Sequence, residues 1–178
     1  MRITLISGLL AGLMSLGMAP VATPHSEKIQ WMGIEEAYAA AQQDGKKILI
    51  DFYTDWCGWC KKLDADTYSK PQVIRYINEH YHAVKFDAEQ KAALTLAGRT
   101  YNFLQQGRSG VHEFSAVMLN GRPSYPSTTI LDPSLNPITT VPGYHGPAEM
   151  LMILSFLGDD HYQTASWEEY QRSYSAPE

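Results

Sequence analysis

The sequence predicts one α/β domain in which helices flank a mixed β-sheet. Strand-length apolar runs alternate with helix-patterned segments in the first half of the chain, an order typical of a βαβ unit. Near the end, two strand-like runs follow each other across a short turn before a last helix, which indicates an antiparallel ββα unit. With 178 residues, the chain is long enough to bury a sizeable core in a single domain.

The first half of the chain divides into helix, strand, helix and strand. Residues 31–44 carry apolar side chains at helical spacing and are followed by a glycine, so we expect an amphipathic helix there. Residues 48–53 form a short apolar run that predicts a buried central strand. A helix is expected over 57–67, and Pro71 is placed to restart or kink it. Residues 83–87 predict the next strand.

The second half of the chain starts with a less regular stretch. Residues 88–110 mix loop signals with a short β-prone stretch, and residues 111–119 have a helical pattern. Strands are expected at 127–132 and 137–141, joined by a turn that begins with proline. The last helix is predicted over 147–157, opened by a proline and closed by a glycine.

The N-terminus has the layout of a secretory signal peptide. Met1-Arg2 is a positive start, an uncharged apolar run over 3–14 follows, and small residues and prolines precede a polar stretch. We expect a signal peptide over 1–22, cleaved between 17 and 22, and therefore a periplasmic or secreted protein. An uncleaved membrane anchor is the alternative, although the apolar run is short for a membrane span.

The rest of the chain is expected to form a domain over 29–160 and a polar, aromatic C-terminal tail over 161–178. Hydrophobic residues make up 44% and charged residues 19% of the chain, which is ordinary for a globular protein. The formal net charge of −5 provides no basic surface for nucleic acid. We expect a monomer that needs no cofactor and no metal.

The chain has only two cysteines, Cys57 and Cys60, which lie in the hexapeptide 56–61. Such a pair can open and close as a disulfide. A helix that begins at Cys57 would direct N–H groups and its positive dipole end toward that sulfur, which lowers the thiol pKa and favours the nucleophilic thiolate. Three other interpretations stay open: two buried thiols, a static disulfide, or half of a zinc site. His80 and His82 could complete a zinc site, but their spacing fits it poorly.

Two segments of the chain carry a family resemblance. Residues 48–61 run from the predicted central strand through the cysteine pair, and Tyr125–Thr128 places a proline before a later strand. Together they resemble the thioredoxin-fold family and, more narrowly, exported bacterial thioredoxin-like proteins of the thiol-disulfide interchange group. The resemblance implies a thioredoxin fold with an insert before the cis-proline strand. The chain departs from the family in the long segment between Asp87 and Pro126, and in Gly58-Trp59, where thioredoxin has Gly-Pro.

Four residues are candidates for the thiol chemistry. Cys57 is expected to be the nucleophile, on the exposed side at the start of the helix, and Cys60 the resolving thiol that attacks the mixed disulfide. The resemblance implies that Asp51, inside an apolar strand, exchanges the proton of the resolving thiol and that Lys85 is its partner. The alternative for Asp51 is a strand-end carboxylate hydrogen-bonded to the backbone.

Five residues are candidates for binding the substrate chain: Trp56, Gly58, Trp59, Tyr125 and Pro126. In the family, a cis-proline loop lies against the active-site disulfide, and the residue before the proline, here Tyr125, offers its backbone to the substrate. Trp59 lies between the cysteines and is expected to be exposed and to meet the substrate. Core packing is the alternative for Trp56, and an ordinary strand-opening position is the alternative for Pro126.

These residues predict an exported thiol-disulfide oxidoreductase that exchanges its Cys57–Cys60 pair with protein thiols and disulfides. The acidic residue in the central strand favours reductase or isomerase work, which needs reducing equivalents from a partner such as a membrane electron carrier. The alternative is a thioredoxin-fold binding or chaperone-like module in which the disulfide is structural.

The insert at 88–110 is too apolar to be a free linker. We expect it to fold as an ordered excursion, a small hairpin, on the flank of the domain. The resemblance implies that the helix over 111–119 is the crossover helix before the cis-proline strand. The insert would then select partners, and its replacement by a short turn is expected to spare the reduction of small disulfides.

Overall fold

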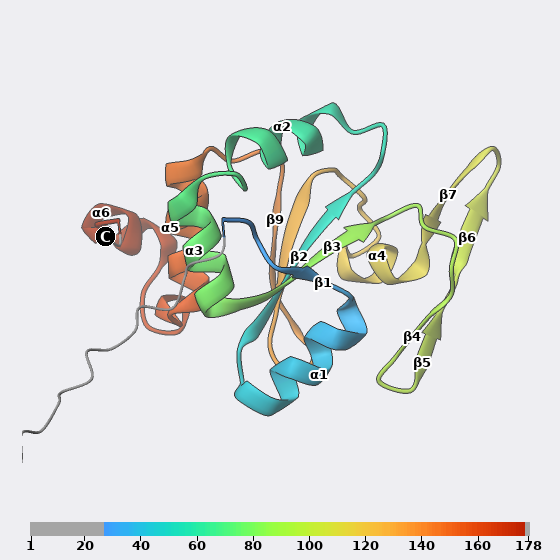
Figure 1. The fold of residues 1–178 in the computed structure, drawn as a ribbon, viewed down its shortest axis with the longest axis horizontal. Coiled ribbons are helices and arrows are strands. Elements are labelled where there is room, and N and C mark those ends of the chain that lie inside the picture. Colours follow the sequence, from blue (N-terminus) through green and yellow to red (C-terminus); the bar gives the residue numbers. More distant parts are fainter. Residues whose placement is uncertain (1–26, 177–178) are drawn as a thin grey trace, which may run out of the picture.

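The computed structural model describes residues 27–176 and is shown in Figure 1. Its strands are β1 (Trp31–Met32), β2 (Lys47–Tyr53), β3 (Tyr81–Asp87), β4 (Leu94–Leu96), β5 (Arg99–Tyr101), β6 (Phe103–Gln106), β7 (Ser109–His112), β8 (Ser127–Leu131) and β9 (Pro137–Pro142). Its helices are α1 (Ile34–Asp44), α2 (Gly58–Asp66), α3 (Pro71–His80), α4 (Glu113–Met118), α5 (Pro147–Gly158), the 3-10 helix η1 (His161–Gln163) and α6 (Trp167–Ser173). The predicted signal peptide over 1–22 lies outside the described residues.

Five of the strands form one mixed sheet in the order β1-β3-β2-β8-β9. Strands β1, β3 and β2 are parallel, whereas β8 is antiparallel to β2 and β9 is antiparallel to β8. The predicted α/β class with a central mixed sheet is thus confirmed. In this register, Asp51 of β2 has Lys85 of β3 as one neighbour and Thr128 of β8 as the other. The register therefore gathers three polar side chains in the middle of the sheet.

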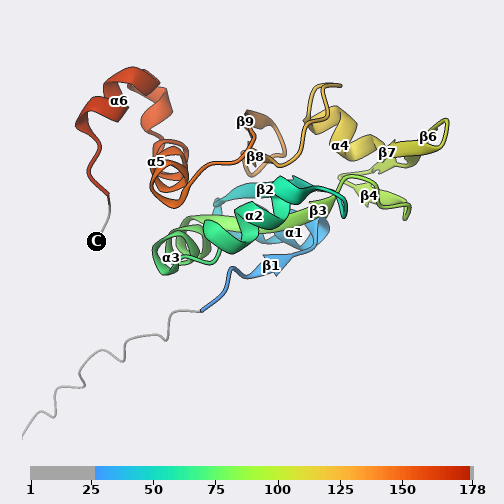
Figure 2. The ribbon, with the colours of Figure 1, turned by 90° about the horizontal axis from the view of Figure 1, so that it is seen from above.

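Helices cover both faces of the sheet (Figures 1 and 2). Because successive side chains of a strand point to opposite faces, the residues of β2 divide between two cores. Ile48, Ile50 and Phe52 pack in one core with residues of α1 and α4. Leu49 packs in the other, with residues of α2, α3 and α5. The alternation places Asp51 on the face of Leu49, which is also the face that α2 covers.

The segment between β3 and α4 folds into two hairpins rather than the single hairpin expected. Strand β4 pairs with β5, and β6 pairs with β7, both antiparallel. The first hairpin belongs to the core, since Leu94, Leu96 and Tyr101 are buried in the cluster that includes α1 and α4. The second hairpin is largely exposed and projects from the end of the molecule opposite α6 (Figures 1 and 2).

Hydrogen bonds of His112 join the end of the second hairpin to the start of the first. The imidazole is fully buried, its Nε2 lies 3.1 Å from the Ala92 carbonyl oxygen, and its backbone N–H donates to the Ala88 carbonyl at 2.7 Å. Replacing all of 88–110 by a short turn would remove these bonds and three core side chains. The expectation that such a replacement spares the reduction of small disulfides stays a prediction, but a shorter deletion at the exposed turn between β6 and β7 would test it without removing these core side chains.

Two helices begin later than the sequence pattern indicates. The backbone of Trp31-Met32 pairs with β3 and forms β1, so α1 starts only after Gly33, which is extended. In the same way, the first two residues of the helix predicted over 111–119 pair with β6, and α4 starts at Glu113. In both places, pairing with another strand outweighs the helical spacing of the side chains.

The C-terminal tail packs against α5. The ring of Phe156 lies 5.3 Å from that of Trp167 and 5.1 Å from that of Tyr170. Ser166 and Glu169 form a capping box that fixes the first turn of α6. Among the helices within residues 27–176, none combines the length and the apolar character needed to cross a membrane.

The Phe114→Ala variant is expected to lower the free energy of unfolding by about 3 to 5 kcal/mol, the usual cost of truncating a buried phenylalanine. Phe114 of α4 is fully buried, and its ring lies 5.0 Å from that of Phe86 and 5.3 Å from that of Tyr101. Urea denaturation followed by circular dichroism measures the change. Val117→Ala, at an exposed position of the same helix, is the control and should stay within about 0.5 kcal/mol of the parent. Similar values for the two variants would show that α4 is not part of the core.

Candidate redox site

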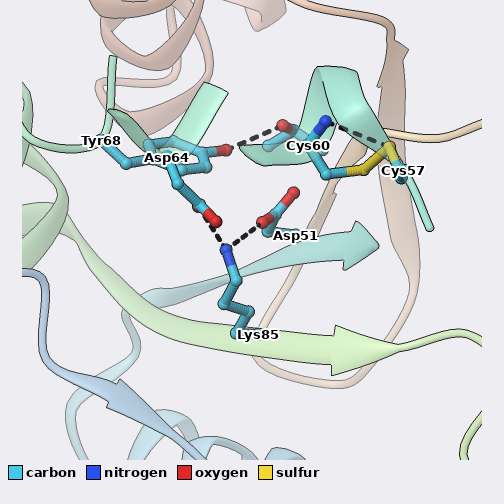
Figure 3. A network of polar contacts seen from close by, with 7 residues as sticks. Asp51, Cys57, Cys60, Asp64, Tyr68 and Lys85 are labelled. Carbon is cyan, nitrogen blue, oxygen red and sulfur yellow. Dashed lines mark hydrogen bonds and ion pairs between the residues drawn. A yellow bond between two sulfur atoms is a disulfide. The ribbon is translucent and has the colours of Figure 1, made fainter. Parts of the chain in front are cut away.

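The two cysteines form a disulfide at the start of α2 (Figure 3). Cys57 is the N-cap residue of the helix, and its Sγ accepts a hydrogen bond from the backbone N–H of Cys60 at 3.0 Å. Because the two sulfur atoms are bonded to each other, neither separate thiols nor half of a zinc site describes this structure. The sulfur of Cys57 occupies the position where the helix dipole and a free N–H group best stabilise a thiolate.

Burial does not distinguish the two cysteines. Cys57 is 4% exposed and Cys60 is 3% exposed, so the expectation that Cys57 lies on an exposed side is not met in the oxidised protein. The two tryptophans of the hexapeptide are strongly exposed instead, Trp56 at 67% and Trp59 at 59%. The assignment of Cys57 as the nucleophile therefore rests on its N-cap position and stays a prediction.

A buried carboxyl group lies on the same face of the sheet as the disulfide. Asp51 is 1% exposed, and its Oδ2 is 2.9 Å from Nζ of Lys85. Burial raises the pKa of Asp51 to about 6, although the nearby Lys85 ammonium acts in the opposite direction. Its Oδ1 has no hydrogen-bond partner within the described residues. The alternative of a strand-end carboxylate bonded to the backbone is wrong, because Asp51 lies inside β2 and is paired with a side chain.

Lys85 holds its charge between two carboxylates. Its Nζ also donates to Oδ1 of Asp64, which comes from α2 (Figure 3). Burial lowers the pKa of Lys85, but the Asp51 and Asp64 carboxylates outweigh burial and raise it above its usual value. The rings of Trp31 and Tyr53 lie 5.2 and 5.3 Å from the ammonium group and stabilise the cation further.

Two residues of this network were missed in the sequence analysis. Asp64 follows Cys60 by four residues, one helical turn, and this spacing is a signal that could have revealed it. Tyr68 has no comparable signal. Its hydroxyl group lies 3.0 Å from Oγ1 of Thr128, and burial raises its pKa well above the usual value, so it stays a neutral hydrogen-bonding group. Only the tertiary fold brings Tyr68 to the strand that carries the cis-proline loop.

The predicted substrate-binding residues lie around the cysteines. The Tyr125–Pro126 peptide bond is cis. The ring of Tyr125 makes an edge contact with that of Trp56 at 6.1 Å, and Trp56 Nε1–H donates to Oε2 of Glu89 at 3.1 Å. Core packing, the alternative for Trp56, is therefore wrong. Glu89 is a further residue beside the cysteines that the sequence did not indicate.

The two residues between the cysteines present an open surface. The ring of Trp59 lies 5.6 Å from that of Tyr144, which precedes α5. A Cβ atom built at Gly58 would meet no atom within 4 Å. The space beside the first turn of α2 is therefore open at this residue. The binding roles of these residues stay predictions. The part of the chain that the structure describes contains no group of three or more His, Cys, Asp or Glu residues that could hold a metal ion.

The fold and the redox site define the class of this protein. A family model described as thioredoxin-like matches residues 30–133, more than half of the chain, and we conclude that the chain belongs to this thioredoxin-like family. The matched range includes β2, the disulfide, Asp51 and Lys85, but it ends shortly after β8.

Particular relatives carry names from thiol chemistry. The chain is 33% identical over 64 residues to the disulfide bond reductase DsbH of Chlamydia pneumoniae, covering 35% of this chain and 39% of that protein. It is 37% identical over 81 residues to the thiol:disulfide interchange protein DsbD of Vibrio cholerae, covering 40% of this chain and 14% of that protein. The chain thus spans well under half the length of these relatives.

One solved structure shows how far the similarity in fold extends. The structure titled DsbH oxidoreductase superimposes with a TM-score of 0.55 at 22% sequence identity, covering 78% of this chain and 92% of that chain. At this level of identity, the comparison supports the fold alone.

The Asp51→Asn variant is expected to raise the free energy of unfolding of the oxidised protein at pH 8 by roughly 3 kcal/mol, and to change it little at pH 4. An aspartate pKa raised from 3.8 to about 6 means that the folded protein binds the proton more tightly than the unfolded chain does. The cost of the buried carboxylate therefore grows between about pH 4 and pH 6 and is constant above that range. A shift of about two pKa units corresponds to roughly 3 kcal/mol.

Urea denaturation of the oxidised protein at several pH values measures this difference. Asp55→Asn removes the same charge at an exposed position and is the matched control. Lys85 keeps Asp64 as a partner in the Asp51→Asn variant, so the lysine is not left unpaired. An equal gain at pH 4 and pH 8 would contradict the pKa of Asp51.

Proposed function

We propose that this protein is an exported thiol-disulfide oxidoreductase that exchanges its Cys57–Cys60 pair with cysteines of other proteins. The observation that carries the proposal is a disulfide at a helix N-terminus above a buried, ion-paired carboxyl group with a pKa near neutrality. A purely structural bridge needs neither the helix N-terminus nor a buried charge, and burying that charge is costly. Membership in the thioredoxin-like family and the names of the relatives support the same activity.

The reaction consists of two thiol-disulfide exchanges. In the reducing direction, the Cys57 thiolate attacks one sulfur of a substrate disulfide, a mixed disulfide forms, and the first substrate thiolate leaves. Cys60 then loses its proton and attacks Sγ of Cys57, which releases the second substrate thiolate and forms the Cys57–Cys60 disulfide. Two electrons pass from the protein to the substrate, and the leaving thiolates take up two protons.

Asp51 is suited to the second exchange because its carboxyl group can hold or release a proton near neutral pH. In our proposal it takes the proton from Cys60 as the mixed disulfide is resolved, and it returns a proton when the disulfide is reduced again. Lys85 orients the carboxyl group through Oδ2, which leaves Oδ1 available for this transfer. Figure 3 shows the carboxyl group on the disulfide side of the lysine.

We propose that the protein works as a reductase or isomerase outside the cytoplasm, after its signal peptide has directed export. The reducing direction consumes two electrons per cycle, so an electron carrier in the membrane would have to reduce Cys57–Cys60 again. The names of the relatives, a disulfide bond reductase and a thiol:disulfide interchange protein, are consistent with this direction.

The Cys60→Ala variant is expected to accumulate covalent complexes with substrate proteins through Cys57, because no second thiol is left to resolve the mixed disulfide. Non-reducing gel electrophoresis of the acid-trapped variant detects such complexes, and added dithiothreitol should release them. Cys57→Ala keeps one cysteine of the pair and is the matched control, which should trap few complexes. Equal trapping by both variants would mean that Cys57 is not the attacking residue.

The reduction potential separates catalysis from a structural bridge. We expect a value for Cys57–Cys60 within about −120 to −270 mV, the range of thiol-disulfide oxidoreductases, whereas structural disulfides lie below about −300 mV. Equilibration with glutathione or dithiothreitol buffers and alkylation of the free thiols give the potential. A value below about −300 mV, together with no reduction of insulin by the reduced protein, would favour the binding-module alternative.

A further inference from the structure

A groove of about 360 Å³ lies beside the redox site, between Trp56 and the second hairpin. Glu89 and Lys91, from the segment after β3, line one part of it. Phe103 of β6 and Arg108, at the hairpin turn, line another part. The groove thus joins the exposed tryptophan next to Cys57 to the largely exposed second hairpin.

The charges that line this groove are unbalanced. The side chains of Lys91 and Arg108 are exposed, and neither forms an ion pair with a carboxylate within residues 27–176. Glu89, the carboxylate of the groove, accepts a hydrogen bond from the neutral indole N–H of Trp56 at 3.1 Å and keeps its charge, so the lining has two cations against one anion. The chain as a whole carries a net charge of −5. Two unpaired cations in one groove of an acidic protein favour an anionic occupant.

The groove also has an apolar wall with a defined shape. The ring of Phe103 lies across Gly110 of the partner strand, so closely that a Cβ atom at residue 110 would come within 2.3 Å of the ring. The ammonium group of Lys91 lies 5.7 Å from the centre of the same ring. A ring and two cations side by side suit a peptide chain, which offers apolar and charged groups at short intervals.

Trp56 connects the groove to the chemistry. Its indole is a wall of the groove, its ring contacts Tyr125 before the cis proline, and the next residue is Cys57. The hydrogen bond to Glu89 fixes the indole in this place. A chain joined to Cys57 in a mixed disulfide and passing over Trp56 would therefore enter the groove.

We propose that this groove binds an acidic segment of the substrate polypeptide close to its reactive cysteine. The inference rests on the proposed function and adds to it a substrate class, protein cysteines with nearby Asp or Glu residues. Selection of partners is thus assigned to Lys91, Phe103 and Arg108 rather than to the whole insert.

Three synthetic peptides of equal length test the proposal. Each carries one cysteine as a mixed disulfide with 2-mercaptoethanol, flanked on both sides by glutamates, glutamines or lysines. The reduced protein is mixed with each peptide at low salt, and quenched samples give the rate constant of reduction. Every rate is divided by the rate with 2-hydroxyethyl disulfide, a small neutral substrate that cannot reach the groove and the cysteines at once.

The glutamate peptide is expected to react about tenfold faster than the lysine peptide, the size of effect that two partly exposed charge pairs give. The preference should shrink toward unity in 1 M salt, since exposed charges are then screened. In the variant Lys91→Gln/Arg108→Gln the preference should disappear, and in Lys91→Glu/Arg108→Glu it should reverse. The variant Lys70→Glu/Arg172→Glu changes the net charge equally at exposed positions outside the groove and should keep the preference.

The outcomes distinguish this inference from the proposed function. No reduction of 2-hydroxyethyl disulfide or of any peptide would overturn the proposed oxidoreductase activity itself. Reduction of the small disulfide together with equal rates for the three peptides would overturn the groove proposal alone. Equal loss of the preference in the groove variant and in the control variant would also overturn it, because the effect would then come from net charge.

Discussion

The ion pair between Asp51 and Lys85 is the interaction on which the rest of the site depends. A carboxylate in the middle of a sheet is costly unless a partner compensates for its lost hydration. The parallel register of β2 and β3 supplies that partner by placing Lys85 beside Asp51. Asp64 and the surrounding aromatic rings keep the lysine charged. The balance between burial and this cation leaves a carboxyl group that can exchange a proton near pH 6.

The parts of the fold that local signals encode were predictable from the sequence. The apolar run of β2, the cysteine pair at a helix start and the cis proline before β8 each depend on neighbouring residues or on a family resemblance. Strand β1 and the two hairpins were missed or only partly predicted, because their short strands are defined by pairing with other segments. The contact of Tyr68 with Thr128 was unpredictable for the same reason, since 60 residues separate its partners.

The two hairpins between β3 and α4 differ in how far they are buried. The first hairpin buries Leu94, Leu96 and Tyr101 against the sheet, so its sequence is constrained by packing. The second hairpin exposes most of its residues, so substitutions there cost little stability. A surface of that kind can change its charge and shape while the core and the disulfide stay the same. If this hairpin selects partners, as we propose, partner choice can vary independently of the fold.

The site thus separates two requirements that conflict in physical terms. Proton exchange by Asp51 needs burial, because exposure to water would return its pKa to the ordinary range. Recognition of a polypeptide needs exposed groups that the partner can reach, and their charges must not lie close enough to change the titration of Asp51. Trp56 and the cis-proline loop lie between these two regions, with the buried cysteines on one side and the exposed groove on the other. Under the proposed function, this arrangement would let a substrate chain bind through charges while its disulfide meets the buried cysteines.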